Sequence, residues 1–84
     1  MRRSLVVGNW KMNGTRASAE LLAKGIIAGL GADVADIAVC VPYVYMPYIA
    51  DLVKDSRLAL GSQNIADQAA GAYTGEISAT MLKE

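Results

Sequence analysis

The residues with the clearest chemical potential lie in the segment Gly-Asn-Trp-Lys-Met-Asn-Gly, residues 8–14. Asn9 and Lys11 are two positions apart, so their side chains project to the same side if strand geometry continues through the segment. Lys11 would supply a cation, and the amide of Asn9 can donate and accept hydrogen bonds. Such a pair suits an anionic metabolite, because a buried lysine is stable only when it is paired. In the alternative interpretation, Asn9 and Asn13 are turn residues and Lys11 is solvated.

The elements that must position these side chains follow from short apolar blocks and from helical spacing. Residues 5–8 and 37–41 are apolar blocks without alternation, which is typical of strands covered on both faces, and residues 58–61 form a third short block. Apolar residues at helical spacing predict helices over residues 15–30 and 45–54. The order of strands and helices predicts an α/β fold with a parallel sheet joined by right-handed crossovers.

Individual residues indicate where the helices begin and end. Thr15 is a suitable cap for the first helix, Gly31 is a suitable stop, and Leu22 lies on its predicted apolar stripe. Pro47 is acceptable only in the first turn of the second helix. Ser78 is a suitable cap for a third helix, after a loop over residues 64–76.

The chain length limits what these elements can build. With 84 residues the chain has room for one small domain. Three strand-helix units are too few to close a barrel, and they leave one face and both edges of the sheet open. A helix that begins at Ser78 would complete fewer than two turns by Glu84. We therefore expect the chain to be the first third of a larger structure rather than a complete gene product.

Composition excludes several classes of function. Eight Lys plus Arg balance eight Asp plus Glu, so a nucleic-acid partner is not expected. The chain has one cysteine and no histidine, which excludes a disulfide framework, a zinc site of Cys and His, and a histidine relay within the chain. No phosphate-binding glycine motif follows a strand, so a nucleotide site is not supported.

The apolar segments and the cysteine of the chain indicate its expected cellular location. The first apolar run breaks at Gly8, which makes it too short for the core of a signal peptide. No window reaches about 18 uninterrupted apolar residues, so no membrane span is expected. Cys40 lies between valines in a predicted strand, which favours an inert core thiol. We expect a soluble protein of the cytoplasm.

Three stretches of the chain resemble the motifs of the triosephosphate isomerase family. They are residues 8–14, the Gly-Ser-Gln-Asn of residues 61–64, and the Gly-Ala-Tyr-Thr-Gly-Glu-Ile-Ser of residues 71–78. Their order and spacing follow the family, and the resemblance covers the whole chain. It implies that residues 1–84 form the first three strand-helix units of a single TIM (β/α)₈ barrel domain, with no second domain. A complete barrel of this kind needs about 250 residues.

The resemblance also implies an activity and a site. In the family, the matching asparagine and lysine line the substrate pocket, so Asn9 and Lys11 are expected to bind a small phosphorylated triose. Lys11 is the expected catalytic residue, because a cation placed there stabilises the negative charge of an enediolate. No cofactor and no metal are implied, and the reaction belongs to glycolysis and gluconeogenesis.

A homodimer is a further implication of the resemblance. In the family, the loop that matches residues 64–76 reaches across a two-fold axis into the partner subunit. Thr74 matches its tip, and Met12 matches the position around which the partner's loop closes. Gln63 and Glu76 match residues that support the interface. Without the resemblance, residues 74–76 are a glycine turn that leads to the next helix.

Other parts of the family's catalytic machinery are missing from this chain. In triosephosphate isomerases, a standard example of tuned acid-base chemistry, a glutamate moves the proton and a neutral histidine polarises the carbonyl. This chain has no histidine and no equivalent base, so it is expected to be inactive alone. Two other interpretations remain: an assembly module that docks with the rest of a barrel or a dimer partner, and a generic protein that binds phosphorylated metabolites.

Overall fold

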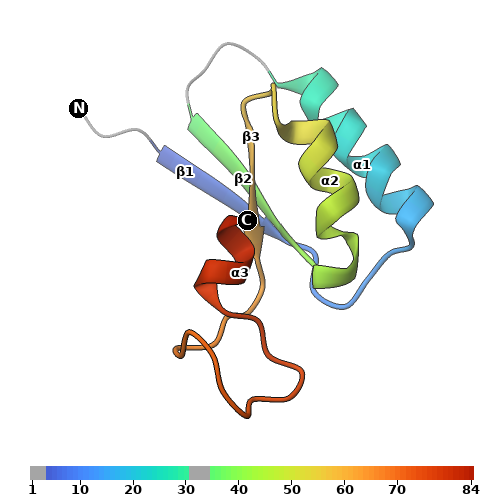
Figure 1. The fold of residues 1–84 in the computed structure, drawn as a ribbon. Coiled ribbons are helices and arrows are strands. Elements are labelled where there is room, and N and C mark those ends of the chain that lie inside the picture. Colours follow the sequence, from blue (N-terminus) through green and yellow to red (C-terminus); the bar gives the residue numbers. More distant parts are fainter. Residues whose placement is uncertain (1–3, 31–34) are drawn as a thin grey trace.

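Three parallel strands form one open sheet in the order β1-β2-β3 (Figure 1). The strands are β1 (Ser4–Asn9), β2 (Ala35–Val41) and β3 (Leu58–Ser62). The computed structural model describes residues 4–30 and 35–84 of the chain. All three strands overlap the apolar blocks predicted from sequence, and each extends one or two residues beyond its block at one or both ends. The predicted open parallel sheet is confirmed.

Helices follow the strands in the predicted order. They are α1 (Arg16–Gly29), the single 3₁₀ turn η1 (Tyr43–Tyr45), α2 (Met46–Val53) and α3 (Ala79–Lys83). Pro47 lies in the first turn of α2, as predicted, where an absent N–H leaves no helical hydrogen bond unmade. Within residues 4–30 and 35–84, no helix has the length and apolar character needed to cross a membrane.

Two side-chain caps predicted from sequence are confirmed. The hydroxyl of Thr15 accepts a hydrogen bond from the N–H of Ser18 at 3.1 Å, and the Ser18 hydroxyl oxygen accepts one from the N–H of Thr15 at 2.8 Å. This reciprocal capping box fixes where α1 begins. The Ser78 hydroxyl accepts a hydrogen bond from the N–H of Met81 at 3.3 Å and starts α3. The predicted stop at Gly31 lies outside the described residues.

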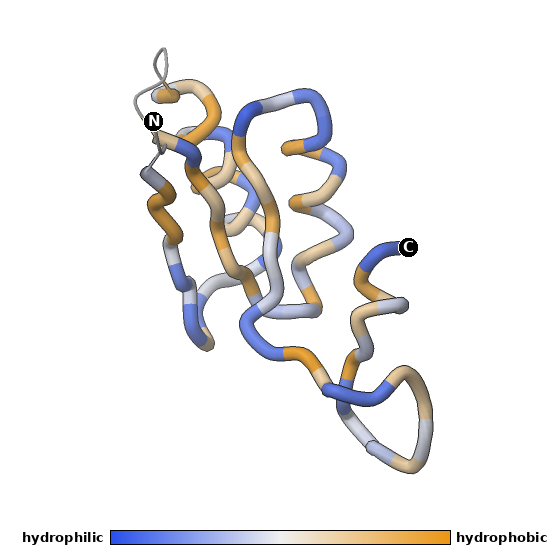
Figure 2. The backbone as a smooth tube through the Cα atoms, turned by 90° about the vertical axis from the view of Figure 1, so that its left-hand side faces the viewer, coloured by the Kyte–Doolittle hydropathy of each residue, from blue (hydrophilic) through white to orange (hydrophobic). Residues whose placement is uncertain are grey.

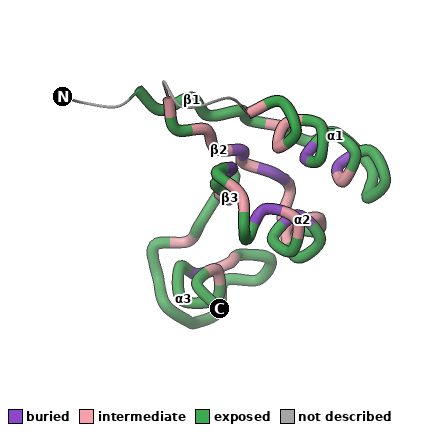
Figure 3. The backbone as a smooth tube through the Cα atoms, turned by 90° about the horizontal axis from the view of Figure 1, so that it is seen from above, coloured by how far each residue is buried: buried purple, intermediate pink, exposed green. Residues whose placement is uncertain are grey.

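The core lies between the sheet and the two longer helices, which share one of its faces. Buried residues gather along β2 and on the sides of α1 and α2 (Figure 3). The buried residues of this core are Ala19, Ala23, Val39, Val41, Ile49, Val53 and Leu58. Along β2, Val39 and Val41 are buried and Cys40 between them is half-buried, so the predicted core thiol faces the less covered side of the sheet.

The buried side of α1 differs from the predicted apolar stripe. The helix buries the alanines Ala19 and Ala23, whereas Leu22 is 50% exposed and Leu21 is 72% exposed. Small alanine side chains let the helix backbone lie close to its neighbours. Leu22 instead lines an open cavity between α1 and the loop after β1. The spacing predicted the helix correctly and its buried face in part, because Ile26 of the predicted stripe packs against the core whereas Leu22 does not.

Strand β1 is apolar and exposed. Leu5, Val6 and Val7 are 64%, 54% and 49% exposed, although the sequence predicts a strand covered on both faces. Figure 2 shows the apolar character of the strands along the sheet. The prediction is wrong for this chain because β1 is an edge strand and the described helices cover only one face of the sheet.

Removal of a central core side chain tests this packing. Ile49 of α2 is fully buried, so Ile49→Ala removes contacts and leaves a cavity. We expect the free energy of unfolding to fall by about 2–5 kcal/mol, measured by urea denaturation. Leu21→Ala is the control, because its exposed side chain should change stability by less than about 0.5 kcal/mol. Equal losses in both variants would contradict the assigned core.

Candidate functional site

The strand register brings two loops together at one edge of the sheet. Asn9 pairs with Cys40, and Cys40 pairs with Gly61, so the three strands end close to one another. A Cβ atom at position 61 would lie 3.2 Å from the Cys40 sulfur, so glycine gives that side chain room. Ligands of parallel α/β folds bind at this carboxyl edge. The loop after β1 and the loop after β3 both begin here.

Lys11 has an unusual backbone conformation directly after β1. Its φ angle is 56°, and it is the only non-glycine residue with positive φ among those described. This left-handed conformation costs a residue with a Cβ atom about 1–2 kcal/mol. Strand geometry therefore stops at Asn9, and the assumed condition for Asn9 and Lys11 to project to the same side is not met. The Asn9 side-chain oxygen instead accepts a hydrogen bond from the N–H of Lys11 at 2.8 Å.

Gln63 makes the second side-chain contact to the backbone of Lys11. Its amide nitrogen donates hydrogen bonds to the carbonyl oxygen of Lys11 at 2.8 Å and to that of Cys40 at 3.1 Å. The Cys40 carbonyl also accepts a hydrogen bond from the N–H of Trp10 at 3.0 Å. One side chain from the end of β3 thus ties together the end of β2 and the loop after β1. Gln63 directly follows the observed β3, and the sequence held no signal for this contact between residues 52 positions apart.

The side chain of Lys11 is exposed at this edge. Within the described residues, no carboxylate lies within ion-pair distance of its ammonium group. Met12 follows as the tip of the loop and is 94% exposed. Asn13 behaves as a turn residue, since its amide donates to the carbonyl oxygen of Trp10 at 2.9 Å. The arrangement combines a hydrogen-bonded backbone with an exposed lysine side chain.

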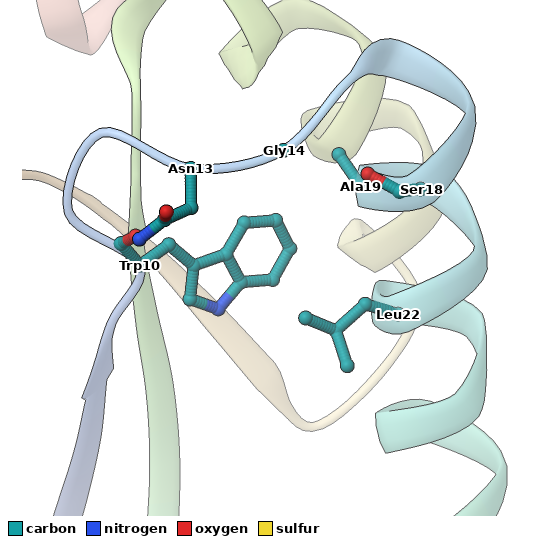
Figure 4. A pocket seen from close by; sticks show the side chains of 6 residues that line it. All are labelled: Trp10, Asn13, Gly14, Ser18, Ala19 and Leu22. Carbon is teal, nitrogen blue, oxygen red and sulfur yellow. The ribbon is translucent and has the colours of Figure 1, made fainter.

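A cavity of about 370 Å³ lies behind this loop, between it and α1 (Figure 4). Its walls are mostly apolar, and the indole of Trp10 points toward Leu22 across it. Asn13 and Gly14 line its rim. Lys11 does not line this cavity, so it is distinct from the predicted anion site. Among residues 4–30 and 35–84, no three His, Cys, Asp or Glu side chains cluster closely enough to hold a metal ion.

The second predicted region is a self-closed loop between β3 and α3. The N–H of Ala66 donates to the carbonyl oxygen of Ile77 at 2.8 Å and closes its base. At its end the N–H of Glu76 donates to the carbonyl oxygen of Tyr73 at 3.0 Å. Gly75 has φ 86°, the positive value that a type II turn requires at its third position. The loop therefore presents Thr74, in the middle of this turn, to the outside.

The structure brings some of the predicted residues together and leaves others apart. Asn9, Lys11 and Gln63 share one hydrogen-bonded network, with Met12 beside it. Thr74 and Glu76 lie in the separate loop, which projects away from the sheet (Figure 1). In the part of the chain that the structure describes, no hydrogen bond joins that loop tip to Lys11.

The arrangement of strands and helices is typical of one broad group of folds. Parallel strands joined by helices, with loops that begin at the carboxyl edge of the sheet, are features of α/β barrels. The three strands form an incomplete barrel. The family model described as triosephosphate isomerase matches residues 4–84. The chain belongs to the triosephosphate isomerase family.

Individual relatives agree with this assignment. The triosephosphate isomerase of Methylococcus capsulatus is 55% identical over 84 residues, which are all of this chain and 34% of the relative. That of Herminiimonas arsenicoxydans is 50% identical with the same coverage. The crystal structure of the Bartonella henselae triosephosphate isomerase matches with a TM-score of 0.85 and 41% identity over 98% of this chain and 34% of that chain. The chain thus spans about a third of the length of the curated relatives it matches.

Replacement of Lys11 by glycine tests the backbone conformation. Glycine adopts positive φ without a steric penalty, although it also loses more backbone entropy on folding. We expect Lys11→Gly to leave the free energy of unfolding unchanged or to raise it by up to about 1 kcal/mol. The measurement is urea denaturation. Lys24→Gly is the matched control, because this exposed lysine lies inside α1, where glycine should cost about 1 kcal/mol. A loss at position 11 as large as that at position 24 would contradict the assigned conformation.

Proposed function

We propose that residues 1–84 are the N-terminal portion of a single (β/α)₈ barrel domain in a triosephosphate isomerase, and that no second domain lies within them. The whole protein would interconvert D-glyceraldehyde 3-phosphate and dihydroxyacetone phosphate by proton transfer through an enediolate. The observation that carries this proposal is the Lys11 network at the carboxyl edge of the sheet, in a chain that belongs to this family. The reaction serves glycolysis and gluconeogenesis in the cytoplasm and uses no cofactor.

The roles of the two site residues follow from their chemistry. The ammonium group of Lys11 is the catalytic group of this segment, because a preplaced cation stabilises the negative charge that develops on the substrate oxygens. Asn9 contributes to substrate binding and fixes the backbone of Lys11 through its side-chain oxygen. The chain has no histidine, so it lacks the electrophilic histidine of the family. The family resemblance places the glutamate base in the part of the protein beyond residue 84. The chain is therefore inactive on its own.

A joined protein tests the function directly. In this protein, residues 1–84 are fused to the part of the Methylococcus capsulatus isomerase that follows the segment matched by this chain. We call the fusion the completed chain. We expect the completed chain to isomerise glyceraldehyde 3-phosphate. We expect Lys11→Met in the completed chain to lower kcat by about 100-fold or more, because the cation is lost. The measurement is steady-state kinetics in both directions.

Lys24→Met is the matched control for that variant, because Lys24 is exposed on α1. It should retain the activity of the unchanged completed chain. Circular dichroism and thermal melting of both variants separate a loss of chemistry from a loss of folding. A folded completed chain without isomerase activity, or one in which Lys11→Met is as active as Lys24→Met, would refute the proposed function.

The proposed partner is a second copy of the same protein, bound through the loop of residues 64–76. Support comes from the self-closed shape of this loop and from the exposed side chains of Thr74 and Met12. A cavity of about 170 Å³ beside Met12 and Val44 offers a concave surface for such a tip. Gln63 and Glu76 would support the interface from the two ends of the loop. A two-fold arrangement makes each contact twice.

A charged tip should prevent this association. We expect Thr74→Arg in the completed chain to raise the dimer dissociation constant at least about 100-fold, because an unpaired charge would be buried in the interface. Sedimentation equilibrium measures the change. Ala28→Arg is the control, since Ala28 is exposed near the end of α1. An unchanged dissociation constant for Thr74→Arg would exclude the loop tip as part of the interface.

One observation favours a second candidate function, a non-catalytic module that docks with the remaining barrel. The apolar side chains of β1 are about half exposed, and an edge strand with such faces is a surface for further pairing. The experiment mixes this chain with a separate piece that carries the later strands of the relative. Activity in the mixture, with none in either piece, would support docking, and a lack of binding would refute it.

A further inference from the structure

A tyrosine from the next strand-helix unit holds the far end of the loop that carries Lys11. Tyr45 is the last residue of η1, and its hydroxyl donates a hydrogen bond of 2.8 Å to the carbonyl oxygen of Gly14. The two residues are 31 positions apart in sequence. The ring of Tyr45 is half-buried and packs against the hydrophobic core. The hydroxyl therefore reaches the loop from a ring that the core already fixes.

The loop depends on this contact because little else secures its second half. Met12 is 94% exposed, and Asn13 bonds back to Trp10 within the same loop. The cap of Thr15 involves only the first turn of α1. Among the described residues, the hydroxyl of Tyr45 makes the one hydrogen bond that joins residues 12–15 to another strand-helix unit.

The accepting residue is itself conformationally special. Gly14 has φ 107°, a conformation that residues with a side chain rarely adopt. Glycine is also the most flexible residue, so a fixed carbonyl here restricts the chain where it would otherwise move most. Side chains from outside the loop thus hold it at two positions, Lys11 and Gly14. The side-chain amide of Gln63 donates to the carbonyl oxygen of Lys11, and the hydroxyl of Tyr45 donates to that of Gly14.

We propose that Tyr45 is a positioning residue, whose hydroxyl orders the loop of residues 10–14 and so holds the ammonium group of Lys11 where the developing charge needs it. This inference rests on the function proposed above. A catalytic group must be held in its productive geometry by contacts outside the site. One neutral hydrogen bond typically contributes a factor of about 2- to 12-fold to such an equilibrium.

The same segment offers two control tyrosines. The hydroxyl of Tyr43 is buried and has no hydrogen-bond partner among the described residues. Tyr48 is partly exposed, and its ring lies under the guanidinium of Arg16 with 3.9 Å from the guanidinium carbon to the ring centre. Replacement of either by phenylalanine keeps the ring and removes a hydroxyl that makes no described hydrogen bond. Neither change should affect the loop.

The test compares Tyr45→Phe, Tyr43→Phe and Tyr48→Phe in the completed chain. We expect Tyr45→Phe to lower kcat by about 2- to 12-fold and to change KM by less than about 2-fold, because the loop is less ordered while substrate contacts remain. Amide hydrogen exchange over residues 9–15, measured by mass spectrometry, should become faster in this variant only. The two control variants should match the unchanged protein in kcat and in exchange.

Several outcomes would overturn the inference. Unchanged kcat in Tyr45→Phe with faster exchange would show that the hydroxyl orders the loop without helping catalysis. Unchanged exchange, or equal effects in all three variants, would show that it does not order the loop. A Tyr45→Phe protein that fails to fold would make the contact a folding contact. If the unchanged completed chain is inactive, the proposed function itself fails. Faster amide hydrogen exchange in Tyr45→Phe would then give Tyr45 only a structural role.

Discussion

The left-handed backbone of Lys11 is the constraint on which the candidate site depends. A lysine keeps a positive φ angle only when surrounding contacts determine its conformation. Here the oxygen of Asn9 binds its N–H, and the amide nitrogen of Gln63 binds its carbonyl oxygen. The two side chains come from the ends of β1 and β3. Lys11 can therefore adopt this conformation only when the first and third strands are both in place.

The sheet acts as the frame that holds these amides. Strand β2 lies between β1 and β3, and the carbonyl oxygen of Cys40 at its end accepts hydrogen bonds from both Trp10 and Gln63. The valines of β2 and Ile49 of α2 bury the middle of the sheet and keep this register. The polar network at the edge thus depends on the apolar core beneath it, although the two share few residues.

The sequence predicts those features that depend on neighbours along the chain. Apolar blocks, helical spacing and capping residues such as Thr15 and Ser78 are local, and the strands, helices and caps they predict are present. Burial was predicted less well, because the exposure of β1 and of Leu22 depends on which elements pack beside them. The same patterns would be buried in a closed barrel.

In the candidate site, too, the sequence predicts local features better than contacts between distant residues. Asn9 and Lys11 were predicted from residue type and from their place after a strand, but extension of strand geometry gave the wrong relation between them. The contact between Gln63 and Lys11 joins residues 52 positions apart, so no local pattern contains it. The roles of Thr74 and Glu76 require a second copy and remain proposals.

A crystal structure of the Gln63→Ala variant of the completed chain tests whether the contact from Gln63 holds the left-handed backbone of Lys11. Without the side-chain amide, the carbonyl oxygen of Lys11 loses its partner, and the cost of a left-handed lysine is no longer offset. We expect Lys11 then to move to a negative φ angle. A φ angle still near the present 56°, with the rest of the loop unchanged, would contradict this expectation.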